Sequence, residues 1–385
     1  MVTERCYLDW NATSPVRPEV AAAVVDLLRA DIGNPASVHA EGRRARRLVD
    51  QARAEVADFV GASAEEVVFT SGGTESNAMA LWGLLAAAGR PGGRPLLISA
   101  SEHPAVWAMA EEMARLGAAV ERIPVSARGV LDLDTLANTL ARRPGAAVAV
   151  QLANSETGVL QDLGAVCALA HGAGARVHCD AVQAAGKVPL PPGRWGVDTL
   201  AVSGHKLGSP PGIGVLVVKS GVALAPLVPG TQERHRRGGT ENVGGIAGLG
   251  VACRLAASEL PRWQLLSGIR DAFERALLEV FPETPVYGAG TPRLANTSCV
   301  GLPPGLRGGA AVAALDLEGF AVSSGPACSS GVERRSSVVE AMGFGKETAE
   351  RTLRVSLGPG TKLEDVLGLV AALERIWCRG KGGTR

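Results

Sequence analysis

The sequence has no excess of charge of either sign. Its 39 Lys and Arg residues balance 38 Asp and Glu residues, which leaves a net charge of +1. A strongly basic surface is the usual sign of binding to nucleic acids or to anionic membranes. The balance excludes those classes as direct partners and favours small or zwitterionic ones.

The sequence also lacks long hydrophobic runs. No window offers the roughly 18 or more apolar residues that a membrane span requires. The N-terminal segment MVTERCYLDW carries charges where a secretory signal needs an apolar core. We therefore expect a cytoplasmic protein that does not associate with a membrane.

Paired cysteines are missing as well. The seven cysteines are an odd number, they are scattered, and no two form a CxxC pair. This pattern argues against a disulfide framework, and also against a zinc or iron–sulfur site built by this chain alone. We expect no metal. The cysteines are Cys6, Cys167, Cys179, Cys253, Cys299, Cys328 and Cys378.

The first two thirds of the sequence predict an α/β domain. Short β-branched runs alternate with Ala- and Leu-rich segments of helical period, as expected for a largely parallel sheet flanked by helices. The predicted strands are 67–70, 96–99, 147–152, 176–178, 199–203 and 214–218. The predicted helices are 75–87, 105–115, 133–142 and 163–171.

The remainder predicts a second, smaller domain. At 385 residues the chain exceeds the usual size of one core. An Ala- and Leu-rich stretch that follows an arginine-rich loop (232–242) is compatible with helix to about residue 280. The runs 296–300, 311–317 and 352–357 mix with helical segments beyond it and indicate an α+β domain. We predict a large domain over residues 16–262 and a small one formed by 1–15 and 263–385.

Polar clusters follow the predicted strands. In parallel sheets, ligands bind beyond the carboxyl ends of the strands. Each cluster alone has a structural explanation, because Ser, Thr and Asp cap helices and Gly forms turns. Together they indicate a ligand site. The clusters are Ser71–Glu75, Glu102–Pro104, Asn154, Asp180 with Gln183, and Ser203–Lys206.

These residue types suit pyridoxal phosphate. Backbone N–H groups of Gly73 and the Thr74 hydroxyl precede a predicted helix, whose positive end favours a phosphate. The Asp180 carboxylate can keep the pyridine nitrogen protonated, which makes the ring an electron sink. Lys206 can bond to the aldehyde, provided that its environment keeps the amine neutral. Ser203 and His205 are further candidate phosphate donors, and His103 is placed to lie against the ring.

One cysteine lies in a segment typical of loops. Cys328 stands in SGPACSSG, where glycine, proline and serine favour turns at the surface. A tolerated surface thiol is the plain interpretation, and a reactive thiol on a movable loop is the alternative. Gly325 and Gly331 are plausible hinges on either side.

Taken together, several motifs resemble those of the cysteine desulfurases, which belong to the class V branch of fold-type I pyridoxal-phosphate enzymes. The similarity runs in order from Tyr7 to the LRVSLG segment at 353–358. The motifs are YLDWNAT (7–13), GNPASVH (33–39), FTSGGTESN (69–77), SEHPAV (101–106), DAVQAAGK (180–187), SGHK (203–206), RRGGTENV (236–243) and SSGPACSSG (323–331).

The resemblance implies a fold-type I enzyme with a mostly parallel seven-stranded sheet, and it assigns roles to individual residues. Lys206 is the lysine that bonds the cofactor, Gln183 contacts its ring hydroxyl, and His103 stacks on the ring and assists proton transfer. Asn154 and Asn34 join Arg354 in holding the substrate carboxylate, with Asn154 also among the cofactor contacts. The phosphate ligands are Gly73, Thr74, Ser203 and His205, with Thr240 reaching the other subunit of a homodimer.

The resemblance further implies that Cys328 takes sulfur from L-cysteine as a persulfide, leaves alanine, and passes the sulfur to an acceptor protein. The acceptor stays open between iron–sulfur assembly, tRNA thiolation and other thio-modification. Selenocysteine lyase or another class V lyase or aminotransferase is the alternative within the fold. A non-catalytic sulfur-relay scaffold is the alternative outside enzymes, against which the set Lys206, Asp180, His103, Cys328 and Arg354 argues. A plain nucleotide-binding protein lacks support, because neither GxGxxG nor GxxxxGK[ST] is present.

Overall fold

The structure is a computed structural model, and it describes residues 5–87, 89, 93–325 and 335–382. Its centre is a seven-stranded sheet whose strand order is β2-β8-β7-β6-β5-β3-β4. The strands β3 to β7 are parallel to their neighbours within this group, whereas β8 is antiparallel to both β2 and β7. The strands are β2 (Val67–Thr70), β3 (Leu96–Ser99), β4 (Val120–Ile123), β5 (Ala147–Gln151), β6 (Arg176–Asp180), β7 (Thr199–Ser203) and β8 (Gly214–Val218).

The mostly parallel sheet confirms the predicted fold class. All predicted strands form, and β6 extends two residues beyond its predicted end, to Asp180. The resemblance implied seven strands, but the position of the seventh, β4, was not predicted. Its sequence VERI places Glu121 and Arg122 in mid-strand, where only the edge of a sheet leaves them access to water. An edge strand therefore lacks the continuous apolar run that marks a buried parallel strand.

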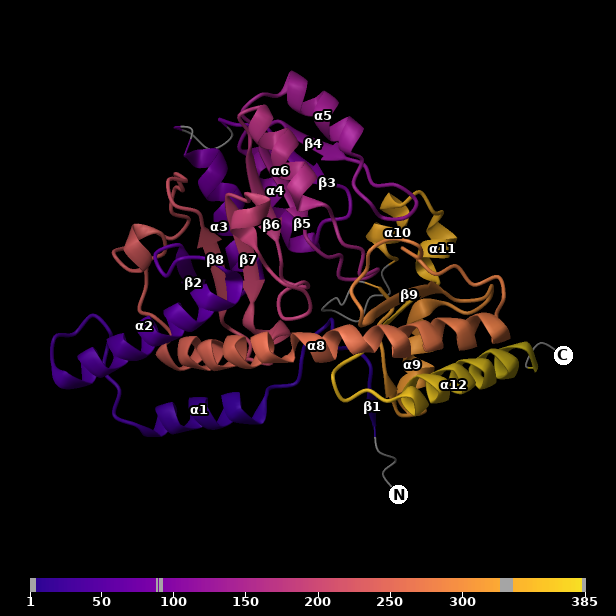
Figure 1. Ribbon diagram of the computed structural model, residues 1–385. Helices are drawn as coiled ribbons and strands as arrows, with labels where there is room; N and C mark the ends of the chain where they lie inside the picture. Colours follow the sequence, from indigo (N-terminus) through magenta and orange to yellow (C-terminus); the bar gives the residue numbers. More distant parts are fainter. Residues whose placement is uncertain (1–4, 88, 90–92, 326–334, 383–385) are drawn as a thin grey trace.

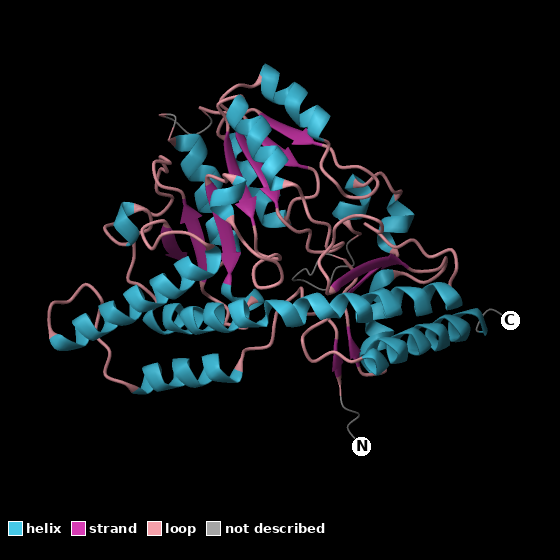
Figure 2. Ribbon diagram, viewed as in Figure 1, coloured by secondary structure: helices cyan, strands magenta, loops and turns pink. Residues whose placement is uncertain are grey.

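Helices cover both faces of the sheet (Figures 1 and 2). Side chains of α3 (Gly73–Ala86) and α4 (Pro104–Arg115) form one apolar cluster with alternate residues of the strands, such as Leu96 and Ile98. Residues on the opposite side of the strands, such as Leu97, pack in a second cluster with the other helices. Those are α2 (Ala40–Val60), α5 (Leu133–Arg142), α6 (Leu163–Gly172) and the first half of α8 (Val243–Val280).

The remaining elements are short or lie outside the sheet layers. The helix α1 (Pro18–Arg29) packs on α8 beside α2. The one-turn helix α7 spans Pro192–Trp195, and two 3-10 turns, η1 and η2, span Gly204–Lys206 and Glu233–His235.

A separate apolar core lies beside the sheet domain. Its strands are β9 (Thr297–Gly301), antiparallel to β11 (Thr352–Ser356), and β1 (Cys6–Tyr7), parallel to β10 (Phe320–Ala321). Its helices are α9 (Gly308–Leu317) and α12 (Leu363–Gly382). The short helices α10 (Ser337–Ala341) and α11 (Lys346–Glu350) lie in the same part of the sequence, but Val338, Val339 and Ala349 pack in the apolar cluster of the sheet domain. Leu8 belongs to this core together with residues of the second half of α8 and of α9, β11 and α12. The run 311–317, which the sequence grouped with β-like segments, is part of the helix α9, so that assignment was wrong.

The helix α8 passes beneath both parts of the molecule (Figure 1). Ile246 and Leu249 pack in the core of the sheet domain, whereas Phe273 and Leu277 pack in the second core. The predicted boundary between residues 262 and 263 falls inside this continuous helix, and the division into domains stays a prediction. By length and composition α8 resembles a membrane span. Its contacts with α1, α2 and α12 are those of a core helix in a folded protein.

A buried ion pair fixes the arginine-rich loop to the sheet domain. Both Arg53 terminal nitrogens donate to the Glu233 carboxylate, at 2.7 and 2.8 Å, and Glu233 also accepts from the backbone N–H of Phe69. Both side chains are almost fully buried. Glu233, Arg234 and His235 have φ angles of 46°, 55° and 63°. Consecutive left-handed residues with side chains are unfavourable, so the ion pair and its hydrogen bonds must compensate for the strain of this turn.

We expect the Arg53→Met substitution to lower the free energy of unfolding by about 3–5 kcal/mol, because it leaves the Glu233 carboxylate buried without its partner. Urea denaturation of the apoprotein measures the change. The matched control is Arg115→Met, which breaks the exposed pair with Glu112 and should cost less than about 1 kcal/mol. If both variants unfold within about 1 kcal/mol of the parent protein, the Arg53–Glu233 pair does not stabilise the fold.

Candidate functional site

A cavity of about 370 Å³ opens beyond the carboxyl ends of the parallel strands. This volume lies within the range of small-molecule and cofactor pockets. Nine of its lining residues were given a role from the sequence: Gly73, Thr74, His103, Asp180, Gln183, Ser203, His205, Lys206 and Arg354. The others include Asn11, Ala12, Asn77, Glu102, Gln151, Ser155, Glu156 and Ser337.

The first turn of α3 forms one end of the cavity. Gly73 begins the helix, and a Cβ atom added there would lie 2.7 Å from Val182 Cγ2, so a larger residue would force the Val182 side chain to move. Thr74 follows it, and Ser203 lies against the same turn. The free N–H groups of a helix N-terminus and these hydroxyls make an environment that favours an anion.

The Asp180 carboxylate is held at the end of β6 by two donors. Asn77 Nδ2 donates to Oδ2 at 2.7 Å, and the Val182 N–H donates to Oδ1 at 2.9 Å. The Asn77 oxygen in turn accepts from His178 Nε2 at 2.9 Å, and His178 Nδ1 is 3.0 Å from Thr199 Oγ1. Burial lowers the pKa of His178 to about 4, so the ring is neutral at pH 7. This series of hydrogen bonds from neutral groups orients the Asp180 carboxylate toward the cavity.

Lys206 lies in the turn that follows β7, and its amine points toward the N-terminal segment. The Nζ atom donates to the backbone oxygens of Asn11 and Ala12, the latter at 2.7 Å. Burial, followed by the nearby Arg354 cation, lowers the pKa of Lys206 to about 7. A substantial fraction of the amine is therefore neutral at physiological pH, as nucleophilic attack by a lysine requires.

Two histidines line the cavity in neutral form. The His103 side chain caps α4, and its Nδ1 accepts from the Ala105 N–H at 3.1 Å, which leaves the ring proton on Nε2. The residue is exposed toward the cavity, and the removal of its ring from bulk water lowers its pKa. Burial lowers the pKa of His205 to about 4, and its Nδ1 lies 3.1 Å from Thr13 Oγ1.

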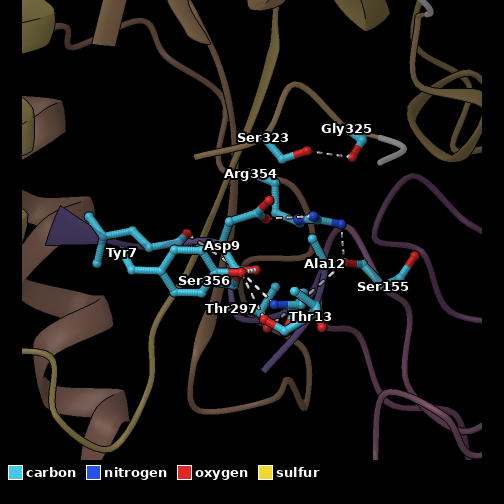
Figure 3. Close-up of polar contacts among 12 residues, drawn as sticks. Tyr7, Asp9, Ala12, Thr13, Ser155, Thr297, Ser323, Gly325, Arg354 and Ser356 are labelled. Atoms are coloured by element: carbon cyan, nitrogen blue, oxygen red, sulfur yellow. Dashed lines mark hydrogen bonds and ion pairs between the residues drawn. The ribbon is translucent and has the colours of Figure 1, made fainter. Parts of the chain in front are cut away.

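Arg354 lines the cavity and contacts Asp9 and Ser155 (Figure 3). Its Nη2 donates to Asp9 Oδ1 at 2.7 Å and its Nη1 to the Ser155 oxygen at 3.2 Å. The side chain is buried, and its Nε has no partner among the described residues. A buried guanidinium with an unused donor is suited to bind a carboxylate.

Two further carboxyl groups line the cavity. Glu102 Oε1 accepts from the Gln151 N–H at 2.7 Å, whereas Oε2 is buried without a partner in the described part of the chain. Burial raises the pKa of Glu102 well above its usual value, with the Asp180 charge adding to the effect. Glu156 accepts from Ser336 Oγ, and burial raises its pKa as well.

Some predicted site residues do not line this cavity. Asn154 is buried behind it, where its Oδ1 accepts from the N–H groups of Glu156 and Thr157 at 2.9 and 2.8 Å. Asn34 is exposed between α1 and α2 and accepts from the Ala36 N–H. Thr240 lies in a separate surface depression with Ser71 and Arg237. Cys328 lies outside the described residues. The roles of these four residues stay predictions.

Sequence reasoning missed several residues of the site. Asn77 and Asn11 were quoted inside motifs without a role, and Glu156 was not noted. Their contacts join segments more than a hundred positions apart, such as Asn77 with Asp180 and Asn11 with Ser356. The only local signal was the position of Asn11 in the segment YLDWNAT, which lies before the first helix.

Comparison with known proteins agrees with this geometry. Residues 6–369 match the aminotransferase class-V family. A cysteine desulfurase of Cereibacter sphaeroides is 40% identical over 377 residues, which cover 97% of this chain and 96% of the relative. A NifS-like protein from Rickettsia africae superposes with a TM-score of 0.88 at 30% identity, covering 97% of this chain and 100% of that structure. SspA in complex with cysteine gives a TM-score of 0.79 at 28% identity, with coverage of 92% and 99%.

Members of this family depend on pyridoxal phosphate and have the fold-type I architecture seen here. The cavity, its lysine and its carboxylate lie at the carboxyl ends of the strands, as the fold requires. The chain therefore belongs to the aminotransferase class-V family, in its cysteine desulfurase branch.

Proposed function

We propose that the protein converts L-cysteine to L-alanine and transfers the sulfur to Cys328 as a persulfide. The observation that carries the proposal is the position of Lys206. Its amine, whose pKa is lowered to about 7, lines the same cavity as the Asp180 carboxylate, the first turn of α3 and the Arg354 guanidinium. A structurally similar protein has been solved in complex with cysteine.

The residues of the cavity fit pyridoxal phosphate. Gly73, Thr74, Ser203 and His205 are grouped at the α3 end, where they would hold the phosphate. Asp180 would pair with the pyridine nitrogen, Gln183 would contact the ring hydroxyl, and His103 would lie against the ring. When bound, the cofactor supplies an electron sink for the bonds around the substrate α-carbon.

The chain's own residues supply orientation and proton transfer. Arg354 binds the substrate carboxylate through its guanidinium group. Its Nε has no partner among the described residues, and its Nη2 can contact Asp9 and the substrate at the same time. We propose that Asn34 and Asn154 support this contact. Lys206 and His103, which have lowered pKa values, accept and return protons near the substrate carbon.

The sulfur transfer is balanced within the substrate and Cys328. The Cys328 thiolate attacks the substrate sulfur, a sulfur–sulfur bond forms, and the carbon–sulfur bond breaks. Its electron pair remains on carbon, which takes a proton to become the methyl group of alanine. A thiol near its ordinary pKa of about 8.5 is mostly protonated at pH 7, so a neighbouring base such as His103 must assist the attack.

We further propose a homodimer in which Thr240 reaches the phosphate of the other subunit. Its surface depression beside Ser71 and Arg237 leaves the residue accessible for such a contact. The partner that receives the sulfur is an acceptor protein in iron–sulfur assembly, tRNA thiolation or another thio-modification. The proposed compartment is the cytoplasm, which keeps thiols reduced.

The test is an anaerobic incubation of the purified holoprotein with L-cysteine and a thiol reductant. We expect alanine and sulfide in equal amounts, because the reductant releases one sulfide from each persulfide. Alanine is measured by amino-acid analysis and sulfide by a colorimetric assay. Absence of both products from a protein that holds its cofactor contradicts the proposal. If selenocysteine alone gives alanine, the protein is a selenocysteine lyase.

A further inference from the structure

A second lysine lies buried beneath the cavity and has no role so far. Lys187 is 3% exposed, and its Nζ donates to Asn11 Oδ1 and to Gln183 Oε1, both at 2.9 Å. The Trp263 ring lies 5.6 Å from Nζ. Burial lowers the pKa of Lys187 well below its usual value, and the Lys206 and Arg354 cations add to this effect. Burial of an amine costs free energy, so we expect its contacts to fix the position of neighbouring groups.

The contacts of Lys187 determine which way the Gln183 amide faces. The Lys187 amine donates to Gln183 Oε1, so the amide oxygen lies on the Lys187 side. The backbone oxygen of Asn11 only accepts, so Nε2, at 2.8 Å, must lie on the Asn11 side. A flipped amide would bring the Gln183 oxygen against the Asn11 oxygen, and it would leave the Lys187 amine without its acceptor on Gln183. Both neighbours therefore enforce one orientation.

This orientation decides what Gln183 offers to a ligand. The residue lines the cavity, and one Nε2 hydrogen is already used on Asn11. The second Nε2 hydrogen remains for the ligand, whereas Oε1 is occupied by Lys187. Gln183 thus acts as a hydrogen-bond donor toward the cavity.

We propose that Lys187 is a positioning residue that locks the Gln183 amide as a donor to the ring oxygen of the bound cofactor. The proposal rests on the proposed function, which places that oxygen beside Gln183. An N–H donated to the oxygen stabilises its negative charge and thereby favours the deprotonated form of the cofactor site. Lys187 also steadies Asn11, whose backbone oxygen accepts from both Gln183 and Lys206.

The test is the pH dependence of the visible absorption of the holoprotein, which reports the protonation of the cofactor site. In Lys187→Met, Oε1 loses its donor and Asn11 loses one of the contacts that hold it in place, so both restraints on the amide weaken and its oxygen can turn to the cavity. We expect the midpoint of the absorption change to rise by about one pH unit or more, since one unit corresponds to about 1.4 kcal/mol and a hydrogen bond to a charged group is at least that strong. Gln183→Leu should give a similar rise, and the double variant no further one.

The control is Asn296→Ala. Asn296 Nδ2 donates to the same Asn11 Oδ1, at 3.2 Å, but does not contact Gln183 in the described structure. Its midpoint should stay at the wild-type value. An equal rise in Asn296→Ala means that general loosening of Asn11 causes the effect, and an unchanged midpoint in Lys187→Met overturns the proposal directly. If Lys187→Met does not fold, an unchanged midpoint in Gln183→Leu overturns it.

The absorption titration does not depend on turnover. If the wild-type protein forms alanine and sulfide but Lys187→Met titrates like wild type, the inference fails and the proposed function stands. If no alanine forms but the midpoint rises in Lys187→Met and not in Asn296→Ala, the positioning role stands and the proposed function fails.

Discussion

We expect the replacement of Cys328 by alanine to abolish the formation of both alanine and sulfide while the cofactor stays bound. The reason is chemical: without the thiolate, nothing accepts the substrate sulfur, and the carbon–sulfur bond does not break. We expect the rate to fall on the order of 10³-fold or more, the scale of losing an essential nucleophile. The measurement is the anaerobic product assay, with the visible absorption spectrum as the check on cofactor binding.

The other cysteines are poor substitutes. Burial raises the pKa of Cys167, and likewise that of Cys6, to about 12. Cys179, Cys253 and Cys299 are fully buried, and none of these five lines the cavity. Cys378 is exposed on α12, so Cys378→Ala is the matched control and should retain full activity. Activity that survives in Cys328→Ala but not in Cys378→Ala would contradict the role of Cys328 and indicate that Cys378 accepts the sulfur.

In the proposed mechanism, replacement of Lys206 by alanine removes both the covalent attachment of the cofactor and a proton carrier. We expect alanine formation to fall by about 10⁴-fold, the upper range for loss of an acid–base group, since the covalent contribution is lost as well. Borohydride reduction followed by mass spectrometry should show cofactor mass on the wild-type protein and none on Lys206→Ala. The control is Lys219→Ala, which removes an exposed lysine. Turnover in Lys206→Ala near the wild-type rate contradicts the role.

The lowered pKa of Lys206 gives a second measurement. Only the neutral amine attacks the aldehyde, so the apoprotein should capture pyridoxal phosphate faster as the pH rises. With a pKa of about 7, the neutral fraction, and with it the capture rate, rises about tenfold between pH 6 and pH 8 and then levels off. N-acetyl-lysine amide, with its ordinary pKa near 10.4, should continue to accelerate through this range. If the capture rate of the apoprotein shows the same pH dependence as N-acetyl-lysine amide, the Lys206 amine is solvated and its pKa is not lowered.

The sheet and the centre of the site could be predicted because their signals are local. Buried parallel strands appear as apolar runs, and the residues that follow them meet at one edge, which brought Thr74, His103, Asp180 and Lys206 together. The edge strand β4 has no such run and was missed. The run 311–317 was assigned wrongly because a short apolar segment fits a buried helix as well as a strand.

The supporting residues had no local signal. Asn77 orients Asp180, and Lys187 orients Gln183, but each effect exists only after distant segments have packed. Asn154 shows the opposite case. It follows a strand as a ligand would, yet its oxygen caps the next turn, which is the usual structural use of asparagine.

The contacts of the N-terminal segment determine when, during synthesis of the chain, the site can be completed. Asp9 contacts Arg354, and the N–H of Asn11 donates to Ser356, across 345 positions in each case. At about 5–20 residues per second, a ribosome takes tens of seconds to cover that distance. Until then, the carbonyl groups that accept from Lys206 belong to a segment that β10 and β11 do not yet hold. The lysine environment is therefore completed only near the end of translation, so a nascent chain with a folded sheet does not yet have the finished catalytic site.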